Sequence, residues 1–244
     1  LVTYEQSVGN KFKIDWSSTV FKSPSFTGYK EVEQLDLATL INYIDWTPFF
    51  HTWELYGKYP EILKDEVVGH EATNLYSDAQ RMLKQLIDEK WLEAKAVIGL
   101  FPANAVGDDI ELYNPKNPNE IIGIQHTLRQ QTQKAAGQPN LALADFIAPK
   151  AENLQDYIGG FVVTTGIGLD KHVERFERDH DDYNSILVKA LADRLAEAFA
   201  EYLHATTRKE LWGYAKDEQL GNDELIKENY VGIRPAPGYP ACPD

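Results

Sequence analysis

The last thirteen residues of the chain combine a cationic side chain with a stiff backbone. Residues 232–244 read GIRPAPGYPACPD, with prolines at four of the nine positions from 235 to 243. Each proline fixes φ at about −65° and excludes a helix, whereas Gly238 is free to take a positive φ. Such an extended segment leaves N–H and C=O groups for which a polar ligand would be a partner. Arg234, at its head, could bind a carboxylate through two hydrogen bonds; a proline-rich tail packed on the surface explains the same composition equally well.

A single acidic residue stands inside the most aromatic stretch of the chain. Five aromatic residues lie between positions 43 and 53, and Asp45 is among them. If it is buried, its carboxylate needs a polar or charged partner. Asp45 also precedes Thr47-Pro48, where an acidic cap and a first-turn proline are both favoured, and the residues alone favour this second interpretation.

No arrangement typical of covalent or metal-dependent catalysis occurs in the sequence. There is no Ser/His/Asp order and no Cys/His pair, and Cys242 is the only cysteine. The acidic pairs Asp108-Asp109 and Asp181-Asp182 carry cation-binding side chains, but a turn and a helix N-terminus explain them better. His51 and Glu54 lie one helical turn apart and are interpreted as surface residues. We therefore predict neither a catalytic residue nor a metal site.

Two further features have a weaker ligand-binding interpretation. Gly166-Ile167-Gly168 follows an apolar strand, as a nucleotide-binding loop would, but the third glycine is missing and no acidic residue ends the strand. A plain strand-to-helix turn is therefore favoured. Glu197 lies among alanines at 196, 198 and 200, which permit close approach of another group. A solvated glutamate is the default interpretation.

Hydrophobic periodicity predicts a mixture of helices and antiparallel strands. Apolar residues recur at spacings of three and four from Val68 to Ile87 and again from Tyr183 to Trp212, which predicts two long amphipathic helices. Shorter helices are expected at 37–44, 170–176 and 223–228, and strands at 32–37, 96–101, 110–113, 120–125 and 157–165. The third and fourth strands form a hairpin whose turn, 114–119, is expected to exceed two residues. The fold class is α+β.

The chain is expected to form one domain after a short lead-in. Residues 1–30 are polar, lack a helical period and predict an extended lead-in or linker, whereas no linker divides residues 31–244. Because the first residue is Leu1 and the only methionine is Met82, we expect the chain to be a piece of a longer polypeptide.

Charge and composition exclude several classes of function. Asp and Glu number 38 against 24 Lys and Arg, giving a net charge of −14. That balance argues against nucleic acid or an anionic membrane as partner, because both require basic patches. No apolar run approaches the ~20 residues that span a bilayer, and the sequence pattern does not predict a signal peptide. One cysteine excludes an internal disulfide and fits a reducing compartment, so a cytoplasmic location is expected.

Six motifs occur in order along the chain from about Val32. They are NYIDWTPFF (42–50), GLFPAN (99–104), LRQQ (128–131), DDYN (181–184), KALADRL (189–195) and RPAPGYPACPD (234–244). Together they resemble the activation domain of cobalamin-dependent methionine synthase. The last motif is similar to the S-adenosylmethionine-binding signature of that family, Arg-x-x-x-Gly-Tyr, here Arg234 to Tyr239.

The resemblance implies a fold and a function. The fold would be a single domain with a bent, mainly antiparallel sheet and long flanking helices. The domain would bind S-adenosylmethionine and position its methyl group for reductive methylation of cob(II)alamin, with the electron supplied by a flavodoxin-type reductase. The Asp-x-His-x-x-Gly cobalamin motif is absent from the sequence, so cobalamin would be held by the cobalamin-binding domain of the parent chain. No protein base or nucleophile is needed, because Co(I) is the nucleophile and the sulfonium carries its own leaving group.

The resemblance also implies a set of ligand-binding residues. Arg234 would bind the carboxylate of the ligand, Asp45 its ammonium, and Glu197 a positive charge. Backbone groups and a close wall would come from Pro235, Ala236, Gly238 and Tyr239. Domains of this family continue beyond the last motif, so we expect the chain to be truncated at its C-terminus.

Two alternatives belong to other classes of protein. A stand-alone S-adenosylmethionine-dependent methyltransferase would need a substrate pocket and an acid/base pair, neither of which the sequence suggests. A non-enzymatic docking module would only recruit the reductase or the corrinoid domain.

Overall fold

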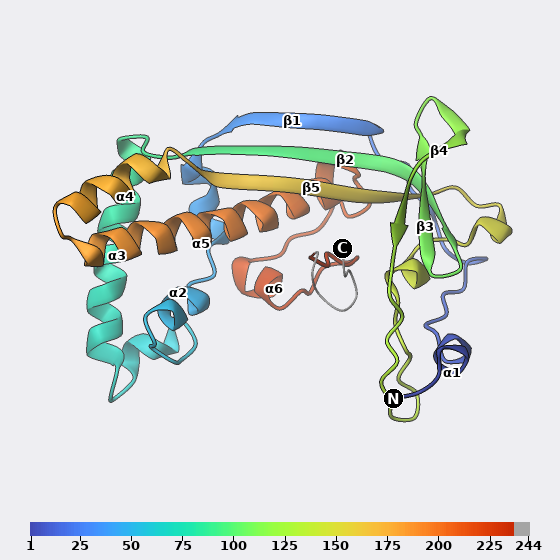
Figure 1. Cartoon of the computed structure of the whole chain (residues 1–244), viewed down its shortest axis with the longest axis horizontal. Helices are drawn as coiled ribbons and strands as arrows, with labels where there is room; N and C mark the ends of the chain where they lie inside the picture. The colour runs from blue at the N-terminus through green and yellow to red at the C-terminus, as the bar shows by residue number, and fades with distance from the viewer. Residues whose placement is uncertain (237–244) are drawn as a thin grey trace.

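The computed structural model describes residues 1–236, which form two arms joined by a bridge of strands (Figure 1). The bridge consists of β1 (Gly28–Leu35), β2 (Glu93–Val106) and β5 (Asp156–Ile167). β2 is the middle strand and runs antiparallel to both neighbours, with Val97 opposite Glu31 on one side and Val162 on the other. The predicted mixture of helices with a mainly antiparallel sheet is confirmed.

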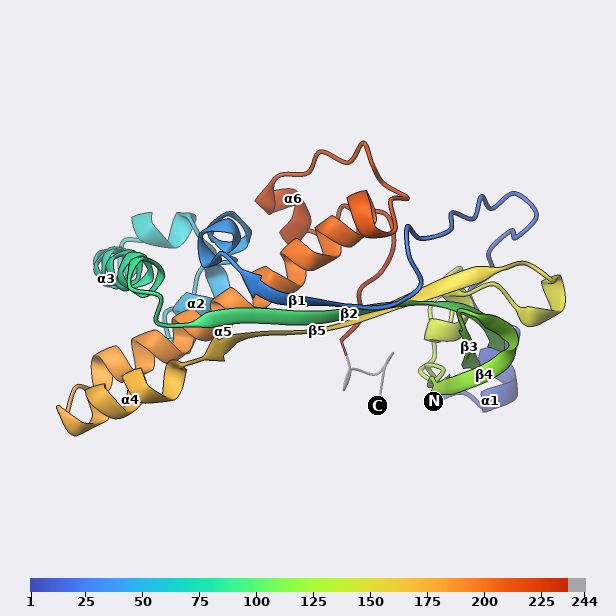
Figure 2. The same cartoon turned by 90° about the horizontal axis from the view of Figure 1, so that it is seen from above.

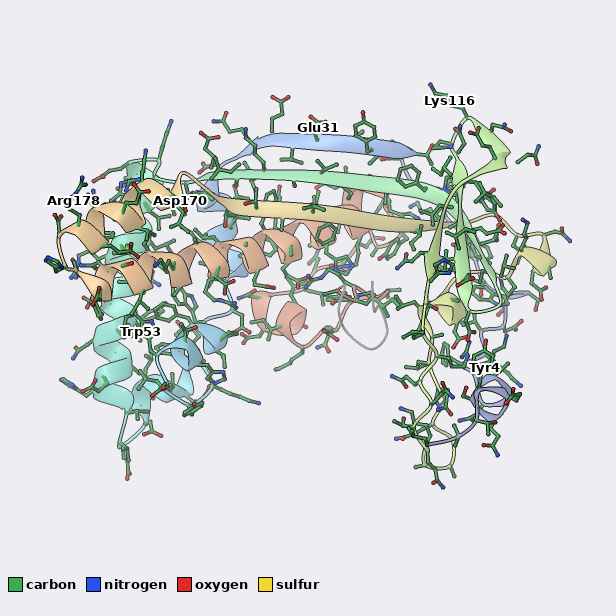
Figure 3. The ribbon with its side chains drawn as sticks, viewed as in Figure 1. Tyr4, Glu31, Trp53, Lys116, Asp170 and Arg178 are labelled. Carbon is green, nitrogen blue, oxygen red and sulfur yellow. The ribbon has the colours of Figure 1, made fainter. Side chains whose placement is uncertain are left out.

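One arm is a β-hairpin that grows from the end of β2. Beyond Leu100 the place of β1 is taken by β3 (Asp109–Asn114), which pairs with β4 (Asn117–His126). The prediction of a long turn is wrong, because Asn114 lies opposite Asn117 and only two residues connect them. The Asn114 side chain accepts a hydrogen bond from the Lys116 amide at 2.9 Å, which holds this tight turn closed. Figure 3 places Lys116 at one end of the arm and Tyr4 near the other.

The other arm is helical and carries the main core. α3 (Gly69–Asp88), α4 (Leu169–Arg178) and α5 (Asp182–Thr206) pack there with α2 (Thr47–Thr52) and a 3-10 helix (Leu37–Tyr43). Both long amphipathic helices are confirmed, and Asp181 caps α5 by accepting from the Asn184 amide. Among the helices of residues 1–236, none has both the length and the apolar content needed to cross a bilayer.

The two cores lie on opposite faces of β2. Ala94, Ala96 and Ile98 belong to the helical core, whereas Ala103 and Ala105 belong to a second, smaller cluster under the hairpin arm. Successive side chains of a strand point to opposite faces, so the even-numbered and odd-numbered positions bury different sides of the sheet. Where no helix covers the odd-numbered face, Val97 is 43% exposed and Val162, opposite it, is 74% exposed.

The N-terminal lead-in contains a helix that the sequence pattern did not predict. α1 (Tyr4–Gly9) is a single short helix held by a capping box between Thr3 and Gln6. The Val2 amide donates to the Gln131 carbonyl at 2.9 Å, and the Trp212 indole donates to the Lys22 carbonyl at 2.7 Å. The lead-in therefore runs from the hairpin arm to the bridge. Because β1 begins at Gly28, the strand crosses the predicted boundary at residue 30.

A buried arginine joins the loops of the hairpin arm. The Arg129 side chain is 1% exposed and pairs with Asp108 at 2.5 Å and Asp145 at 2.7 Å, while Asp109 pairs with His126 at 2.9 Å. The hydrogen bonds that Arg129 donates to Asp145 and Asp108 raise its pKa, and burial opposes this shift. Within residues 1–236, no group of three or more His, Cys, Asp or Glu side chains is placed to hold a metal ion. Asp108 and Asp109 lie at the turn between β2 and β3, and their carboxylates are engaged by Arg129 and His126.

The Gly166–Gly168 segment is a strand-to-helix turn, as the sequence analysis favoured. Gly168 takes a φ of +95° immediately before α4. A Cβ built on it would lie 2.6 Å from the carbonyl oxygen of Trp91, which is a backbone atom that cannot move away easily. Both the dihedral and the close approach require glycine at this position.

We predict that Gly168→Ala destabilises the fold by about 2 kcal/mol or more, because a left-handed residue with a side chain costs about 1–2 kcal/mol before the clash is added. The matched control is Gly160→Ala in β5, where an added Cβ meets nothing within 4 Å. That change is expected to be neutral or stabilising by up to about 1 kcal/mol. Urea denaturation of the three proteins measures both effects, and equal midpoints would contradict the assignment.

Candidate functional site

A cluster of polar side chains lies at the C-terminal end of α5. Glu201, His204 and Arg208 are spaced by three and four residues, so they project from one side of the helix. After Thr206 the helix widens into one π turn (Thr207–Leu211), in which the Trp212 amide donates to the Thr207 carbonyl five residues back at 2.8 Å. In Figures 1 and 2, the following chain with α6 (Asn222–Ile226) lies between the two arms along the length of the molecule.

Arg208 is the centre of this cluster. Its side chain is fully buried, with 0% exposure. Nε and Nη2 donate to the two carboxylate oxygens of Glu218 at 2.9 and 2.7 Å, and Nη1 donates to Nδ1 of His204 at 2.6 Å. The ring of Tyr230 covers the guanidinium at 4.2 Å. This buried charge is therefore paired, hydrogen-bonded and stacked, which are the conditions under which burial of an arginine is tolerated.

The protonation state of His204 follows from this geometry. A guanidinium only donates hydrogen bonds, so Nδ1 of His204 must accept, and the neutral ring carries its proton on Nε2. Burial, together with the positive charges of Arg208 and Arg234, lowers the pKa of His204 to about 3. The ring also meets the edge of Tyr230, with centroids 4.8 Å apart. His204 is thus a neutral acceptor over the whole physiological range.

Arg234 returns to α5 through a turn that requires glycine. Gly232 takes a φ of +105°, and a Cβ there would lie 2.8 Å from the hydroxyl oxygen of Tyr214. After this turn, Nη2 of Arg234 donates to Oε2 of Glu201 at 2.9 Å. The two side chains are 27% and 12% exposed. Burial raises the pKa of Glu201, and the charges of Arg234 and Arg208 oppose that shift.

The pair between Arg234 and Glu201 is joined at one point only. Within residues 1–236, Nε of Arg234 and Oε1 of Glu201 are both buried and have no hydrogen-bond partner. An unpaired buried donor and an unpaired buried acceptor each cost about 1–3 kcal/mol. The pair therefore has capacity for one further acceptor and one further donor.

Asp45 lies in a segment that borders the same end of α5. Its Oδ1 accepts from the Thr47 amide, the first of α2, at 2.9 Å, so the expected bond to the start of this helix is present, although the N-cap position is Trp46. The preceding Tyr43 packs edge-on against Tyr202, with ring centroids 5.4 Å apart. Asn222 in α6 donates to the carbonyl of Ile44 at 3.0 Å. These contacts place the backbone next to Asp45 against both α5 and α6.

The other predicted site residues differ in how they are placed. Glu197 is exposed on α5, four residues before Glu201. Pro235 and Ala236 are exposed and directly follow Arg234. Gly238 and Tyr239 lie outside the described residues. The structure thus connects Arg234 to the α5 cluster, and the ligand roles of all these residues, Arg234 included, stay predictions.

Four residues of the cluster were missed by the sequence analysis. They are Glu201, His204, Arg208 and Tyr230. The sequence does contain a signal for the first three, because Glu201, His204 and Arg208 are polar residues spaced by three and four at the end of a helix that is otherwise rich in apolar residues. The apolar stripe through Tyr202 and Leu203 concealed it, because a buried arginine is identified only by its partners, and two of these, Glu218 and Tyr230, lie later in the chain.

Comparison with known proteins identifies the architecture. The sequence model of a family described as "Vitamin B12 dependent methionine synthase, activation domain" matches residues 36–244. A solved structure described as "Crystal Structure of the MetH Reactivation Domain bound to AdoHcy" is 57% identical in sequence and superposes with a TM-score of 0.93. The match covers 99% of this chain and 74% of that chain.

We predict that His204 makes folding stability sensitive to acid. Its folded pKa is about 3, against an ordinary value of 6.5, so below pH 6.5 the unfolded chain binds a proton that the folded chain does not. Stability from this group is therefore complete above pH 6.5 and is lost as the pH falls toward 3. By about pH 4.5 the loss is about 2.7 kcal/mol, at about 1.36 kcal/mol per pH unit.

The measurement is the free energy of unfolding against pH for the parent and for His204→Gln, whose amide oxygen can still accept from Arg208. The variant should lose less stability between about pH 6.5 and 4.5. His70→Gln, at an exposed position on α3, is the control and should keep the slope of the parent. A parent-like slope in His204→Gln would show that His204 is not the titrating group.

Proposed function

The chain belongs to the vitamin B12-dependent methionine synthase activation domain family, and from this premise we propose that it binds S-adenosylmethionine beside the end of α5 and presents the methyl group to a corrinoid. One observation carries the proposal: a relative with 57% identity is described as bound to AdoHcy. S-Adenosylhomocysteine is what remains of S-adenosylmethionine after its methyl group has been transferred. A site that binds one therefore supports binding of the other.

Arg234 is the proposed anchor for the carboxylate of the ligand. It is the first residue of the Arg-x-x-x-Gly-Tyr signature, and its side chain is 27% exposed, so a ligand can reach it. Its Nε has no partner among the described residues. An arginine binds a carboxylate best through two parallel N–H···O bonds, and an unused Nε provides one of them.

The remaining proposed contacts come from residues near this anchor. Asp45 would bind the ammonium with the oxygen that does not accept from the Thr47 amide, and Glu197 would offset positive charge from its exposed position on α5. Pro235, Ala236, Gly238 and Tyr239 would supply backbone groups and a close wall along the ligand.

The proposed chemistry needs positioning and no protein base. The sulfonium of S-adenosylmethionine carries its own leaving group, so no proton has to be removed or delivered by a side chain. The corrinoid, when held by its own domain, supplies a nucleophilic cobalt. The work of this chain is to hold the methyl group in the line of attack, and well-oriented reactants can lower a barrier by about 7–11 kcal/mol.

We propose two protein partners for the domain. The cobalamin-binding domain of the parent chain would dock on the ligand side, and a flavodoxin-type reductase would supply the electron. The alternative, a docking module without ligand, predicts no saturable binding of S-adenosylmethionine or S-adenosylhomocysteine. Calorimetric titration of the chain with both compounds separates the two functions.

We predict that Arg234→Ala weakens S-adenosylmethionine binding by about 10- to 100-fold, because a hydrogen bond to a charged group contributes about 1.5–3 kcal/mol. Arg234→Lys keeps the charge but loses the planar fork, so it should recover only part of the loss. The measurement is the dissociation constant by calorimetry for the three proteins.

Decarboxylated S-adenosylmethionine is the control ligand, because it lacks the group that Arg234 would bind. It should bind the parent weakly and be almost indifferent to Arg234→Ala, and the difference between the two ligands gives the coupling directly. If Arg234→Ala weakens both ligands equally, Arg234 shapes the segment and does not contact the carboxylate.

We also predict that the chain accelerates transfer of a labelled methyl group from S-adenosylmethionine to a reduced corrinoid on the isolated cobalamin-binding domain, because it would hold the donor in the line of attack. The label on the corrinoid is followed with time, with and without this chain. Equal rates in the two reactions would contradict the proposed function.

A further inference from the structure

We propose that Glu201 is the second half of the amino-acid subsite, orienting Arg234 through one carboxylate oxygen and binding the ammonium of the ligand with the other. This inference rests on the proposed function and adds a residue to it. The sequence motifs do not include Glu201, since KALADRL ends at residue 195 and the C-terminal motif begins at residue 234.

The ion pair between Arg234 and Glu201 leaves part of its hydrogen-bonding capacity unused. Nη2 of Arg234 donates to Oε2 of Glu201 at 2.9 Å, which leaves Nε of the arginine and Oε1 of the glutamate. Neither atom has a partner among residues 1–236, although both are buried. Arginine and glutamate can form two parallel hydrogen bonds, so a pair joined at one point leaves a donor and an acceptor unused.

The two unused atoms differ in charge and in hydrogen-bonding role. One is a donor on a cation and the other is an acceptor on an anion, and they belong to side chains in direct contact. An α-amino acid presents the complementary set, with a carboxylate and an ammonium on the same carbon. A zwitterion would therefore satisfy both atoms at once and remove two buried unpaired groups.

No other anion of the cluster is better placed to bind the ammonium. Glu218 has both carboxylate oxygens occupied by Arg208 at 2.9 and 2.7 Å. His204 is neutral, and its Nδ1 accepts from Arg208. Asp45 is compatible with the proposal, because an ammonium has three N–H donors and the carboxylates of Asp45 and Glu201 can each accept one.

The test compares S-adenosylhomocysteine with its deamino analogue, 4-(adenosylthio)butanoate, on the parent and on Glu201→Gln. Glutamine keeps the length and one acceptor oxygen for Arg234 but removes the negative charge. We expect Glu201→Gln to weaken S-adenosylhomocysteine by about 10- to 100-fold, equivalent to about 1.4–2.8 kcal/mol. The deamino analogue should change by less than about 3-fold, because it has no ammonium to lose.

Two further variants serve as controls for the charge and for the position of Glu201. Glu201→Asp retains the charge with a shorter reach and should recover part of the binding of S-adenosylhomocysteine. Glu210→Gln removes the same charge from an exposed position in the following π turn and should leave both dissociation constants unchanged. Thermal unfolding of every variant confirms that the protein titrated is folded.

The possible outcomes separate this inference from the proposed function. Equal weakening of both ligands by Glu201→Gln would mean that Glu201 only holds Arg234, and no effect on either would mean that it lies outside the site; each result overturns the inference while the proposed function stands. A parent that binds neither ligand would overturn the proposed function and, with it, the inference. A loss confined to S-adenosylhomocysteine supports both.

Discussion

The burial of Arg208 is the constraint on which the arrangement of the site depends. Removing the charged partner of a buried guanidinium costs about 3–5 kcal/mol, so separation of Arg208 from its partners is strongly unfavourable. Those partners are His204, Glu218 and the ring of Tyr230, which are spread over the last part of the described chain. One side chain thus fixes the end of α5 and the path of the residues after it, and Arg234 follows Tyr230 by four residues.

The second constraint is the continuity of β2 through both arms. A strand can bury one face at its start and the other at its end only if different elements cover it at the two places, and here α5 covers the first and the hairpin arm the second. The arms therefore share one rigid strand without sharing a core. α5 packs on β2 and β5, and the Thr165 hydroxyl of β5 donates to the Ala192 carbonyl of α5 at 2.8 Å. This packing sets the position of the site at the end of α5 relative to the bridge.

Periodicity and capping predicted most of the elements, but not the polar site. The stripe from Val68 to Ile87 predicted α3, and Asp181 predicted the start of α5, because both signals are local in sequence. The turn of the hairpin was predicted too long, since the bond from the Lys116 amide to Asn114 depends on a side-chain conformation that composition does not show. Arg234 was found because its segment is unusual in itself. Glu201 and Arg208 were missed, since what distinguishes them is a partner 33 residues away for one and 10 for the other.

The charges of the cluster suit a zwitterion better than an ion. Arg208 and Arg234 contribute two positive charges, Glu201 and Glu218 two negative ones, and His204 none, so the charges of these five residues sum to zero. An amino-acid group brings no net charge and enters without requiring a proton to move. The sulfonium differs, because its positive charge disappears from sulfur as the methyl group leaves. A carboxylate in contact with that sulfur would stabilise the reactant more than the transition state and slow the transfer. We therefore expect the acidic groups that contact the ligand to lie at its amino-acid end, and the sulfonium to be stabilised by the long-range field of a chain whose net charge is −14 and not by a direct partner.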